Sequence, residues 1–264
     1  MKLSISQMGW DPADNDEVFV YLKDQGFQGL EVLPAMTIGS NPYDLLDEAA
    51  AFQQRLAGKY ALEIASMQSL IYGRCENLFG TDEERKELLD YLKKAILFAE
   101  KIHCPNLVFG SPKNRLMGEK TNSKEKQAVQ FFKELGNFAY KHKTIFSLEA
   151  NPAIYGGDYV LTTQQALEVI KNVNSPGFCL NFDVGTVIAN DESLDLLKEN
   201  IDLLNHIHIS EPFLEKIQPR SLHQELANLL HKLNYQKYIS IEMKKLGNFK
   251  ETKEVIIYIK NIFT

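Results

Sequence analysis

Short apolar runs and longer amphipathic stretches alternate along the chain. Each run holds four to six residues that are rich in β-branched, aromatic and other apolar side chains, as buried strands do. The stretches between the runs carry apolar positions at helical spacing. We predict strands at residues 3–6, 29–33, 62–67, 106–109, 145–149, 178–183, 206–209 and 238–242. We predict helices at about residues 14–25, 44–58, 82–103, 123–142, 162–173, 192–202, 221–233 and 250–262.

This alternation predicts parallel strands, because consecutive parallel strands need a crossover that returns the chain to the same end of the sheet. Eight units in 264 residues average 33 residues each, close to the smallest strand–helix–strand unit. We therefore predict an α/β protein with a single domain over residues 1–264, a closed (β/α)8 TIM barrel. An open doubly wound sheet is the alternative. The usual nucleotide-binding signatures, a Gly-x-Gly-x-x-Gly after the first strand and a P-loop, do not occur.

Local signals mark several helix ends. Thr81 precedes three acidic residues, a combination that caps and stabilises the start of a helix. Thr163 and Asn248 are weaker signals of the same kind. Gly26 follows a predicted helix and suits a left-handed C-cap. Gly136 falls inside a predicted helix, where a missing side chain indicates close packing.

Composition narrows the class of protein. The chain is 44% hydrophobic and 24% charged, which is enough apolar surface for a folded core. It has no apolar run of 18 residues, so we expect no membrane span. The net charge of −6 gives no general attraction to nucleic acid. The N-terminal residues do not read as a secretory signal, and Cys75, Cys104 and Cys179 lack zinc or disulfide spacing, so we expect a cytoplasmic protein with free thiols.

Four consecutive predicted strands, the fifth to the eighth, carry ionisable side chains at their ends. These are Glu149, Asp183, His208 and Glu242, separated by 34, 25 and 34 residues. Because the active site of a barrel lies at the C-terminal ends of its strands, we expect the four side chains to meet there. Three carboxylates at one place would repel each other without a cation. Three oxygens and one imidazole nitrogen favour Mn²⁺, Mg²⁺ or Co²⁺, with Zn²⁺ as an alternative.

The motifs around these residues resemble those of the xylose isomerase-like TIM barrel superfamily, the sugar (phosphate) isomerase/epimerase group. They read SLEANP around Glu149, LNFDVGT around Asp183, HIHISEP around His208 and ISIEM around Glu242, and the resemblance extends over essentially the whole chain. It implies that the four side chains bind one divalent metal ion. It also implies that Glu149 and Glu242 are catalytic and move protons on opposite faces of a substrate. The resemblance favours His208 over His206 as the ligand, and we expect His206 to be packed or to support a ligand.

The chemistry of such a site follows from its ligands. A sugar carbonyl and the neighbouring hydroxyl can chelate the metal, which polarises the carbonyl and stabilises an enediolate. One carboxylate then removes the adjacent carbon-bound proton and a second one returns it. We expect an isomerase or epimerase (EC class 5) acting on a sugar, sugar phosphate or sugar-like keto compound. A metal-dependent dehydratase, which is a lyase, and a non-catalytic barrel that binds a sugar acid are the alternatives.

Departures from two branches of the superfamily narrow the substrate. Free-ketose 3-epimerases carry Glu, His and Arg where this chain has Tyr155, Thr186 and Leu214, which disfavours that substrate class. Apurinic endonucleases hold three metals through additional histidines, and this chain has Gln68, Val108–Ser111 and Thr186 in those places. DNA cleavage is therefore disfavoured. We expect a small sugar-like substrate and no nucleic-acid or membrane partner. The resemblance also implies that the chain can form a homo-oligomer.

Further side chains on the predicted loops are candidates for binding the substrate. Lys113 and Arg115 follow the fourth strand, where cations can hold a phosphate or carboxylate. Glu211 lies three residues after His208 and is also placed to orient a metal ligand. The full set of predicted substrate-binding residues is Gln68, Lys113, Arg115, Asn151, Tyr155, Glu211 and His223.

Overall fold

Eight parallel strands close into a barrel in the computed structural model, which describes residues 1–264. Each strand pairs with the next one along the chain, and β8 pairs with β1. The strands are β1 (Lys2–Ser6), β2 (Gly29–Val32), β3 (Glu63–Met67), β4 (Asn106–Phe109), β5 (Ile145–Glu149), β6 (Phe178–Asp183), β7 (Leu204–Ile209) and β8 (Tyr238–Ile241). The predicted (β/α)8 barrel is confirmed, and the open sheet is wrong.

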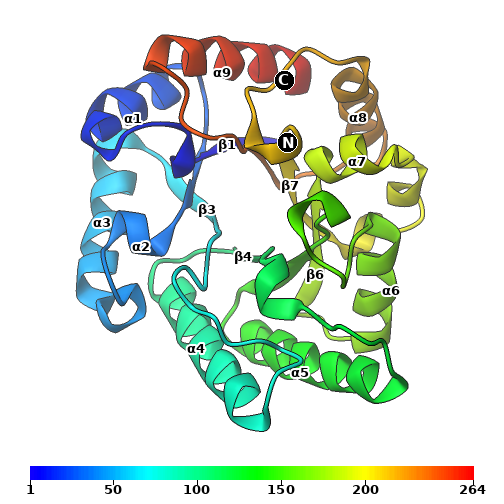
Figure 1. The fold of residues 1–264 in the computed structure, drawn as a ribbon. Helices are drawn as coiled ribbons and strands as arrows, with labels where there is room; N and C mark the ends of the chain where they lie inside the picture. Colours follow the sequence, from blue (N-terminus) through cyan, green and yellow to red (C-terminus); the bar gives the residue numbers. More distant parts are fainter.

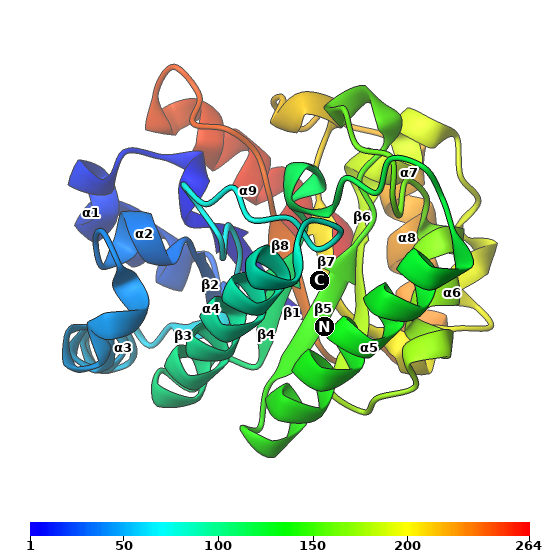
Figure 2. The ribbon, with the colours of Figure 1, turned by 60° about the horizontal axis from the view of Figure 1, so that its bottom comes forward.

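Helices surround the barrel in chain order, from the blue α1 to the red α9 in Figure 1. They are α1 (Asn15–Asp24), α2 (Pro34–Thr37), α3 (Leu46–Tyr60), α4 (Asp82–Lys101), α5 (Asn122–Lys141), α6 (Thr163–Val173), α7 (Val184–Asn190), α8 (Ser221–Lys232) and α9 (Phe249–Phe263). The last helix returns to the first, and Lys253 Nζ of α9 lies 2.9 Å from Glu17 Oε1 of α1. The long loops after β3 and β5 lie on one side of the barrel (Figure 2).

The helix ends follow local side-chain chemistry. Thr81 and Glu84 form a complete capping box at the start of α4, as the sequence predicted. Gly26 has a φ of 80° just after α1, which suits a residue without a side chain. A side chain at Gly136 would lie 2.7 Å from Ser175 Oγ, so α5 does pack closely there. The cap of α6 is Thr162 rather than the predicted Thr163.

The predicted helix at residues 192–202 is wrong. The helix that follows β6 is α7, which begins immediately after Asp183, and residues 194–197 and 201–203 form two short 3₁₀ turns. Asp183 caps α7 by accepting the backbone N–H of Thr186 at 2.7 Å. Asp191, with a φ of 53°, ends the helix in the left-handed conformation.

Polar side chains fill much of the barrel interior. Along β8, Ile239 and Ile241 alternate with Ser240, whose hydroxyl lies 2.7 Å from that of Ser4 on β1. Asn106 similarly accepts a hydrogen bond from Ser147 on the neighbouring strand at 2.5 Å. Apolar residues usually fill the layers of such a barrel. The polar interior of this one allows ionisable groups to extend below the mouth.

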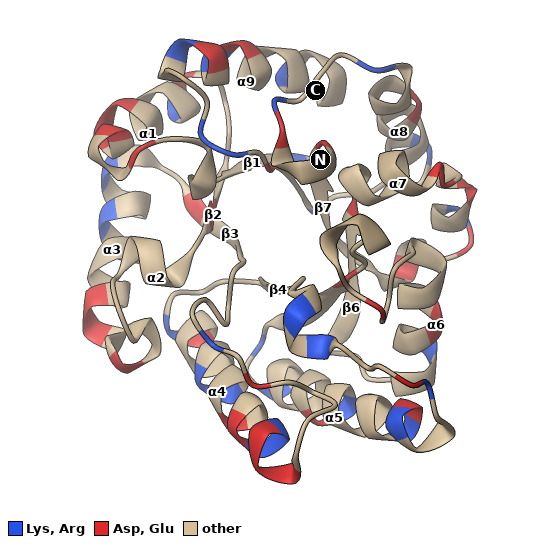
Figure 3. Cartoon of the chain, in the orientation of Figure 1, with Lys and Arg blue, Asp and Glu red and all other residues tan.

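Basic and acidic residues, coloured blue and red in Figure 3, are interspersed along the outer helices. Pairs such as Lys93 of α4 and Glu134 of α5, 2.5 Å apart, connect neighbouring helices. No helix is both long enough and apolar enough to cross a membrane.

Candidate metal centre

Four ionisable side chains meet where β5 to β8 end. They are Glu149, Asp183, His208 and Glu242, and one ligand atom from each lies within 4.8 Å of the others. His208 Nδ1 lies 2.8 Å from Glu149 Oε1 and 3.2 Å from Glu242 Oε2. Asp183 and His208 are partners in the register of β6 and β7, which sets their side chains at the same height. The structure thus brings together the four residues that the sequence proposed as ligands.

A second buried group lies on the other side of the His208 ring. His208 Nε2 lies 2.9 Å and 3.1 Å from the two carboxylate oxygens of Glu31, a residue of β2. His206 Nε2 lies 3.3 Å from Glu31 Oε2. All three side chains are at most 1% exposed. Glu31 was not among the predicted site residues, although an acid within the apolar run at 29–33 is a signal that could have indicated it.

Burial and like charge dominate the electrostatics. Burial, together with Glu149 and Asp183, raises the pKa of Glu242 to about 7. Burial, and then the charge of Glu149, raises the pKa of Asp183. Burial opposes the charged form of His208, but Glu242 and Glu31 nevertheless hold its pKa well above the ordinary value. These side chains therefore hold protons that a bound cation would displace.

The residues present fit a divalent cation. Three buried carboxylates and one imidazole form a donor set of three oxygens and one nitrogen with a deficit of positive charge. Donors also hold the ligand oxygens in place: Asn181 Nδ2 donates to Glu149 Oε1 at 2.7 Å, and the Ser210 hydroxyl donates to Asp183 Oδ1. Metal ligands are commonly oriented by such hydrogen bonds.

We expect the affinity for Mn²⁺ to fall as the pH falls. The raised pKa of His208 means that its imidazole keeps its second proton at neutral pH. Glu242, with a pKa of about 7, gains a proton below that value. Each displaced proton should weaken binding by about tenfold per pH unit in the range where it is bound. Calorimetric titration with Mn²⁺ between about pH 8 and pH 6, in two buffers of different protonation enthalpy, measures both the affinity and the released protons. A dissociation constant that is independent of pH would contradict this electrostatic picture.

Gly110, the first residue after β4, leaves the room that Glu149 occupies. A Cβ atom at this position would overlap Glu149 Oε2, which is the far end of a flexible side chain. We expect Gly110→Ala to displace that carboxylate and to weaken Mn²⁺ binding by about tenfold while the barrel stays folded. Gly58→Ala on α3, where a Cβ meets nothing within 4 Å, is the matched control. Equal Mn²⁺ affinity in the two variants, measured by calorimetry, would show that Glu149 does not need this space.

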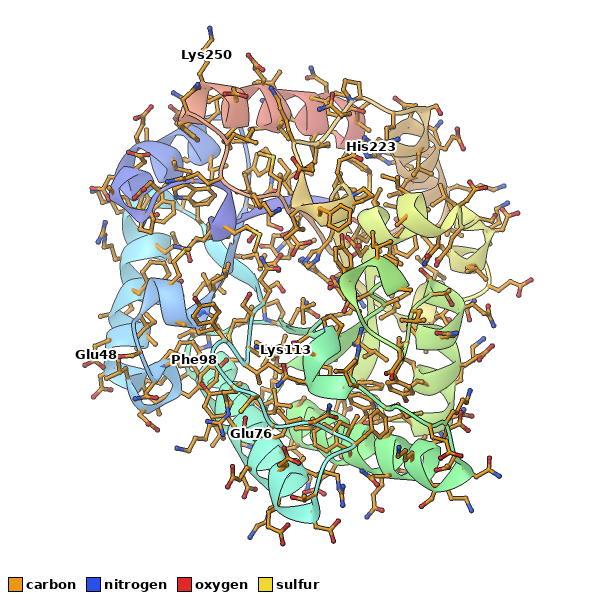
Figure 4. All side chains as sticks on the ribbon, in the orientation of Figure 1. Glu48, Glu76, Phe98, Lys113, His223 and Lys250 are labelled. Atoms are coloured by element: carbon orange, nitrogen blue, oxygen red, sulfur yellow. The ribbon has the colours of Figure 1, made fainter.

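A cavity of about 740 Å³ opens above the four ligands. Glu149, Asp183 and Glu242 lie in its wall, and so do four of the predicted substrate-binding residues: Gln68, Lys113, Asn151 and Tyr155. Its other residues include the apolar side chains Met8, Leu70, Ile71, Tyr72, Val108, Phe109 and Leu214. Figure 4 shows Lys113 on the loop after β4, beside the opening of the barrel. The cavity therefore combines a polar floor with partly apolar walls.

The structure places three of the predicted substrate-binding residues outside the cavity wall. Arg115 is fully buried beneath the loop and donates to the carbonyl oxygen of Glu149 at 2.8 Å and to Asn151 Oδ1 at 2.7 Å. Glu211 pairs with Arg220 at 2.6 Å and contacts no metal ligand. Both side chains are therefore occupied elsewhere and do not line the cavity.

His223, the third of these residues, lies at the start of α8 (Figure 4). Its Nδ1 lies 2.9 Å from the Tyr258 hydroxyl, and its Nε2 has no hydrogen-bond partner. Burial lowers its pKa to about 4, so this histidine is neutral. The side chain is fully buried and does not line the cavity.

Sequence reasoning also missed the residues that support the ligands. Asn181 contacts Glu149, and Thr186 and Ser210 both donate to Asp183. Asn181 stands two positions before Asp183 on β6, so strand alternation could have placed it on the same face. Ser210 directly follows β7 and stands two positions after His208, so the same alternation could have placed it beside the ligands.

Comparison with known proteins assigns the chain to a family. The family model described as xylose isomerase-like TIM barrel matches residues 19–262. No curated protein sequence matches the chain.

Several solved structures share the fold. The 3-keto-D-glucoside 4-epimerase from E. coli is 17% identical, with a TM-score of 0.80 and coverage of 99% of both chains. The D-psicose 3-epimerase from Clostridium cellulolyticum H10 is 13% identical, with a TM-score of 0.79 and coverage of 100% of this chain and 99% of that one. A family 2 AP endonuclease from Brucella melitensis is 18% identical, with a TM-score of 0.73 and 96% coverage of both. On the family match, this chain belongs to the xylose isomerase-like TIM barrel family.

Proposed function

We propose that this chain is a divalent-metal-dependent isomerase or epimerase of a sugar or sugar-like keto compound. The observation that carries the proposal is the pair of buried glutamates in the floor of the cavity. Glu149 on β5 and Glu242 after β8 come from separate strands, yet both approach His208 Nδ1 within 3.2 Å. Two carboxylates at one site can remove a proton from a bound substrate and return it.

The proposed cofactor is one Mn²⁺, Mg²⁺ or Co²⁺ ion, with Zn²⁺ as the alternative, held by Glu149, Asp183, His208 and Glu242. When bound, such an ion would polarise a substrate carbonyl and acidify the neighbouring C–H bond. The pKa of Glu242, which burial raises to about 7, suits a group that gains and loses a proton near neutral pH. Glu149, held by Asn181 and Asn151, is the partner that we propose for the opposite face.

Two observations guide the choice of substrate. Lys113 is the one Lys or Arg that lines the cavity, which supports a substrate with an anionic group such as a phosphate or carboxylate. Thr186 stands where free-ketose 3-epimerases carry a histidine, and its hydroxyl oxygen lies 2.9 Å from Ala150 O and 2.8 Å from Asp183 Oδ2. Because Thr186 is fully buried in these contacts, a free ketose of that class remains disfavoured.

The experiment that tests this function uses D₂O. The protein is loaded with Mn²⁺ or Co²⁺ and incubated with a panel of ketoses, keto-glycosides, sugar phosphates and 2-keto acids. We expect one panel compound to gain one deuterium, and the labelled carbon then distinguishes an isomerase from an epimerase. Loss of water would indicate the dehydratase, which the same site could support. Metal binding with no change in any compound would favour a barrel that only binds sugar acids.

A further inference from the structure

We propose that Glu31 is a positioning residue for the metal centre. It fixes the proton of the His208 imidazole on Nε2, so that the lone pair of Nδ1 points to the position between Glu149 and Glu242. This inference rests on the proposed function, because it concerns the same metal centre. Glu31 lies on β2, outside the four ligand motifs, and it does not line the cavity.

The contacts of the His208 ring carry the first step. Nε2 lies 2.9 Å and 3.1 Å from the two oxygens of Glu31, and Nδ1, on the other side of the ring, lies 2.8 Å from Glu149 Oε1. A carboxylate can only accept a hydrogen bond, so Nε2 must be the donor. Nδ1 faces the carboxylates of Glu149 and Glu242, so it also carries a proton until a cation takes that proton's place. Once the Nδ1 proton is displaced, an imidazole that keeps its other proton on Nε2 has its acceptor lone pair on Nδ1. Glu31 therefore selects the tautomer that a metal at Nδ1 needs, with the proton on Nε2.

His206 holds Glu31 in this role. Its Nε2 lies 3.3 Å from Glu31 Oε2, and its ring stands nearly perpendicular to that of His208, at 89°. Glu31 thus lies between two imidazoles and cannot turn away from one without weakening its contact with the other. The relative exposure of all three side chains is 0–1%, so the contacts of Glu31 do not compete with bulk water.

The cost of burying Glu31 points to function rather than to folding. A fully buried carboxylate is expensive, and apolar residues of similar volume often replace a buried ion pair with no loss of stability. Barrel interiors of this kind are commonly filled by Val, Ile and Leu. An acid at this place is therefore best explained by what it does to the histidine that it contacts.

A second reading of the same cluster is a separate metal site, since Glu31, His206 and His208 offer three ligand atoms within 4.8 Å. Burial disfavours it. All three residues are buried and none lines the cavity, which leaves no solvent-facing position for a water ligand to complete the coordination. Glu31 and His206 therefore support the ligand His208 of a single metal centre.

The test is Mn²⁺ titration of the full chain after removal of metal with EDTA. Glu31→Gln keeps the shape of the side chain and one carbonyl acceptor but removes the charge. We expect it to weaken Mn²⁺ binding by about 10–100-fold at an unchanged stoichiometry of one ion per chain. We also expect the visible spectrum of the Co²⁺-loaded variant to differ from that of the wild type. Ser4→Ala is a polar-to-apolar change in the same barrel interior, at a hydroxyl that hydrogen-bonds to Ser240 and Ile239, and it should bind Mn²⁺ as the wild type does.

Other results would overturn the inference. An unchanged affinity and Co²⁺ spectrum in Glu31→Gln would give Glu31 a structural role only. Two ions per wild-type chain, with one lost in the variant, would make Glu31 a ligand. A wild type that binds no Mn²⁺ would overturn both Glu31's role and the metal centre. Weakened binding in Glu31→Gln, together with no deuterium exchange in any compound, would leave Glu31's role standing and remove the proposed function alone.

A measurement on the wild type keeps the inference falsifiable if Glu31→Gln does not fold. Zn²⁺ is diamagnetic, so ¹⁵N NMR of the Zn²⁺-loaded chain can report the state of each histidine nitrogen. We expect His208 to carry its proton on Nε2 and to bind the metal through Nδ1. A proton on Nδ1 would overturn the inference.

Discussion

Replacing Glu242 by glutamine is expected to lower turnover by about 100-fold or more while the barrel remains folded. Glutamine keeps the size of the side chain but cannot accept or release a proton, and general acid–base groups contribute roughly 10²- to 10⁴-fold to rate. Glu242 is suited to this role because burial and the neighbouring carboxylates raise its pKa to about 7. The measurement is the rate of deuterium incorporation into the active compound of the panel at saturating Mn²⁺.

Because Glu242 is also a proposed ligand, metal content has to be measured in the same samples. Glu215→Gln, at a side chain that is 71% exposed beside Lys244, is the control for loss of one carboxylate. It should keep wild-type turnover and Mn²⁺ affinity. Turnover at the wild-type rate in Glu242→Gln would remove this residue from the proton transfer. A loss of turnover that occurs at low Mn²⁺ and is absent at saturating Mn²⁺ would give Glu242 the role of ligand alone.

Replacing Arg115 by methionine is expected to destabilise the protein by about 3–5 kcal/mol. Its guanidinium is fully buried and donates to the carbonyl oxygens of Phe109 and Glu149 and to Asn151 Oδ1. Burial lowers the pKa of Arg115 to about 10, so the group is still charged at neutral pH. Methionine would take this donor away from three buried acceptors. Urea unfolding followed by circular dichroism measures the change in the free energy of unfolding.

Lys113, two residues earlier on the same loop, gives the matched comparison. Its side chain is exposed at the cavity, so Lys113→Met should leave the free energy of unfolding within about 0.5 kcal/mol of wild type. It should instead raise KM for an anionic substrate. If Arg115→Met has the wild-type free energy of unfolding and only raises KM, then Arg115 binds the anionic group of the substrate, as the sequence predicted.

Much of the fold was accessible from the sequence because each strand carries its own pattern. Buried parallel strands read as short apolar runs, and polar residues such as Ser240 inside the barrel did not hide them. The four proposed ligands were found for a related reason. Each stands at a strand end, and closure of the barrel brings strand ends together whatever the lengths of the loops.

The remaining parts of the site depend on which partner a side chain finds, and spacing alone does not reveal this. Arg115 and Lys113 look alike in the sequence, yet the loop turns one inward to three carbonyl-type acceptors and leaves the other at the cavity. Glu211 looked free to orient a ligand, but Arg220, nine residues later, pairs with it. Glu31 was read as part of an apolar strand because its partners, His206 and His208, are about 175 residues away.

The central claim is that Glu149, Asp183, His208 and Glu242 hold one divalent metal ion in the floor of the cavity. It is tested most directly by anomalous diffraction from crystals of the protein soaked in Mn²⁺. We predict a single strong anomalous peak per chain, in contact with the three carboxylates and with His208 Nδ1. A well-occupied peak elsewhere, or no peak with the four side chains ordered as in the metal-free protein, would contradict it.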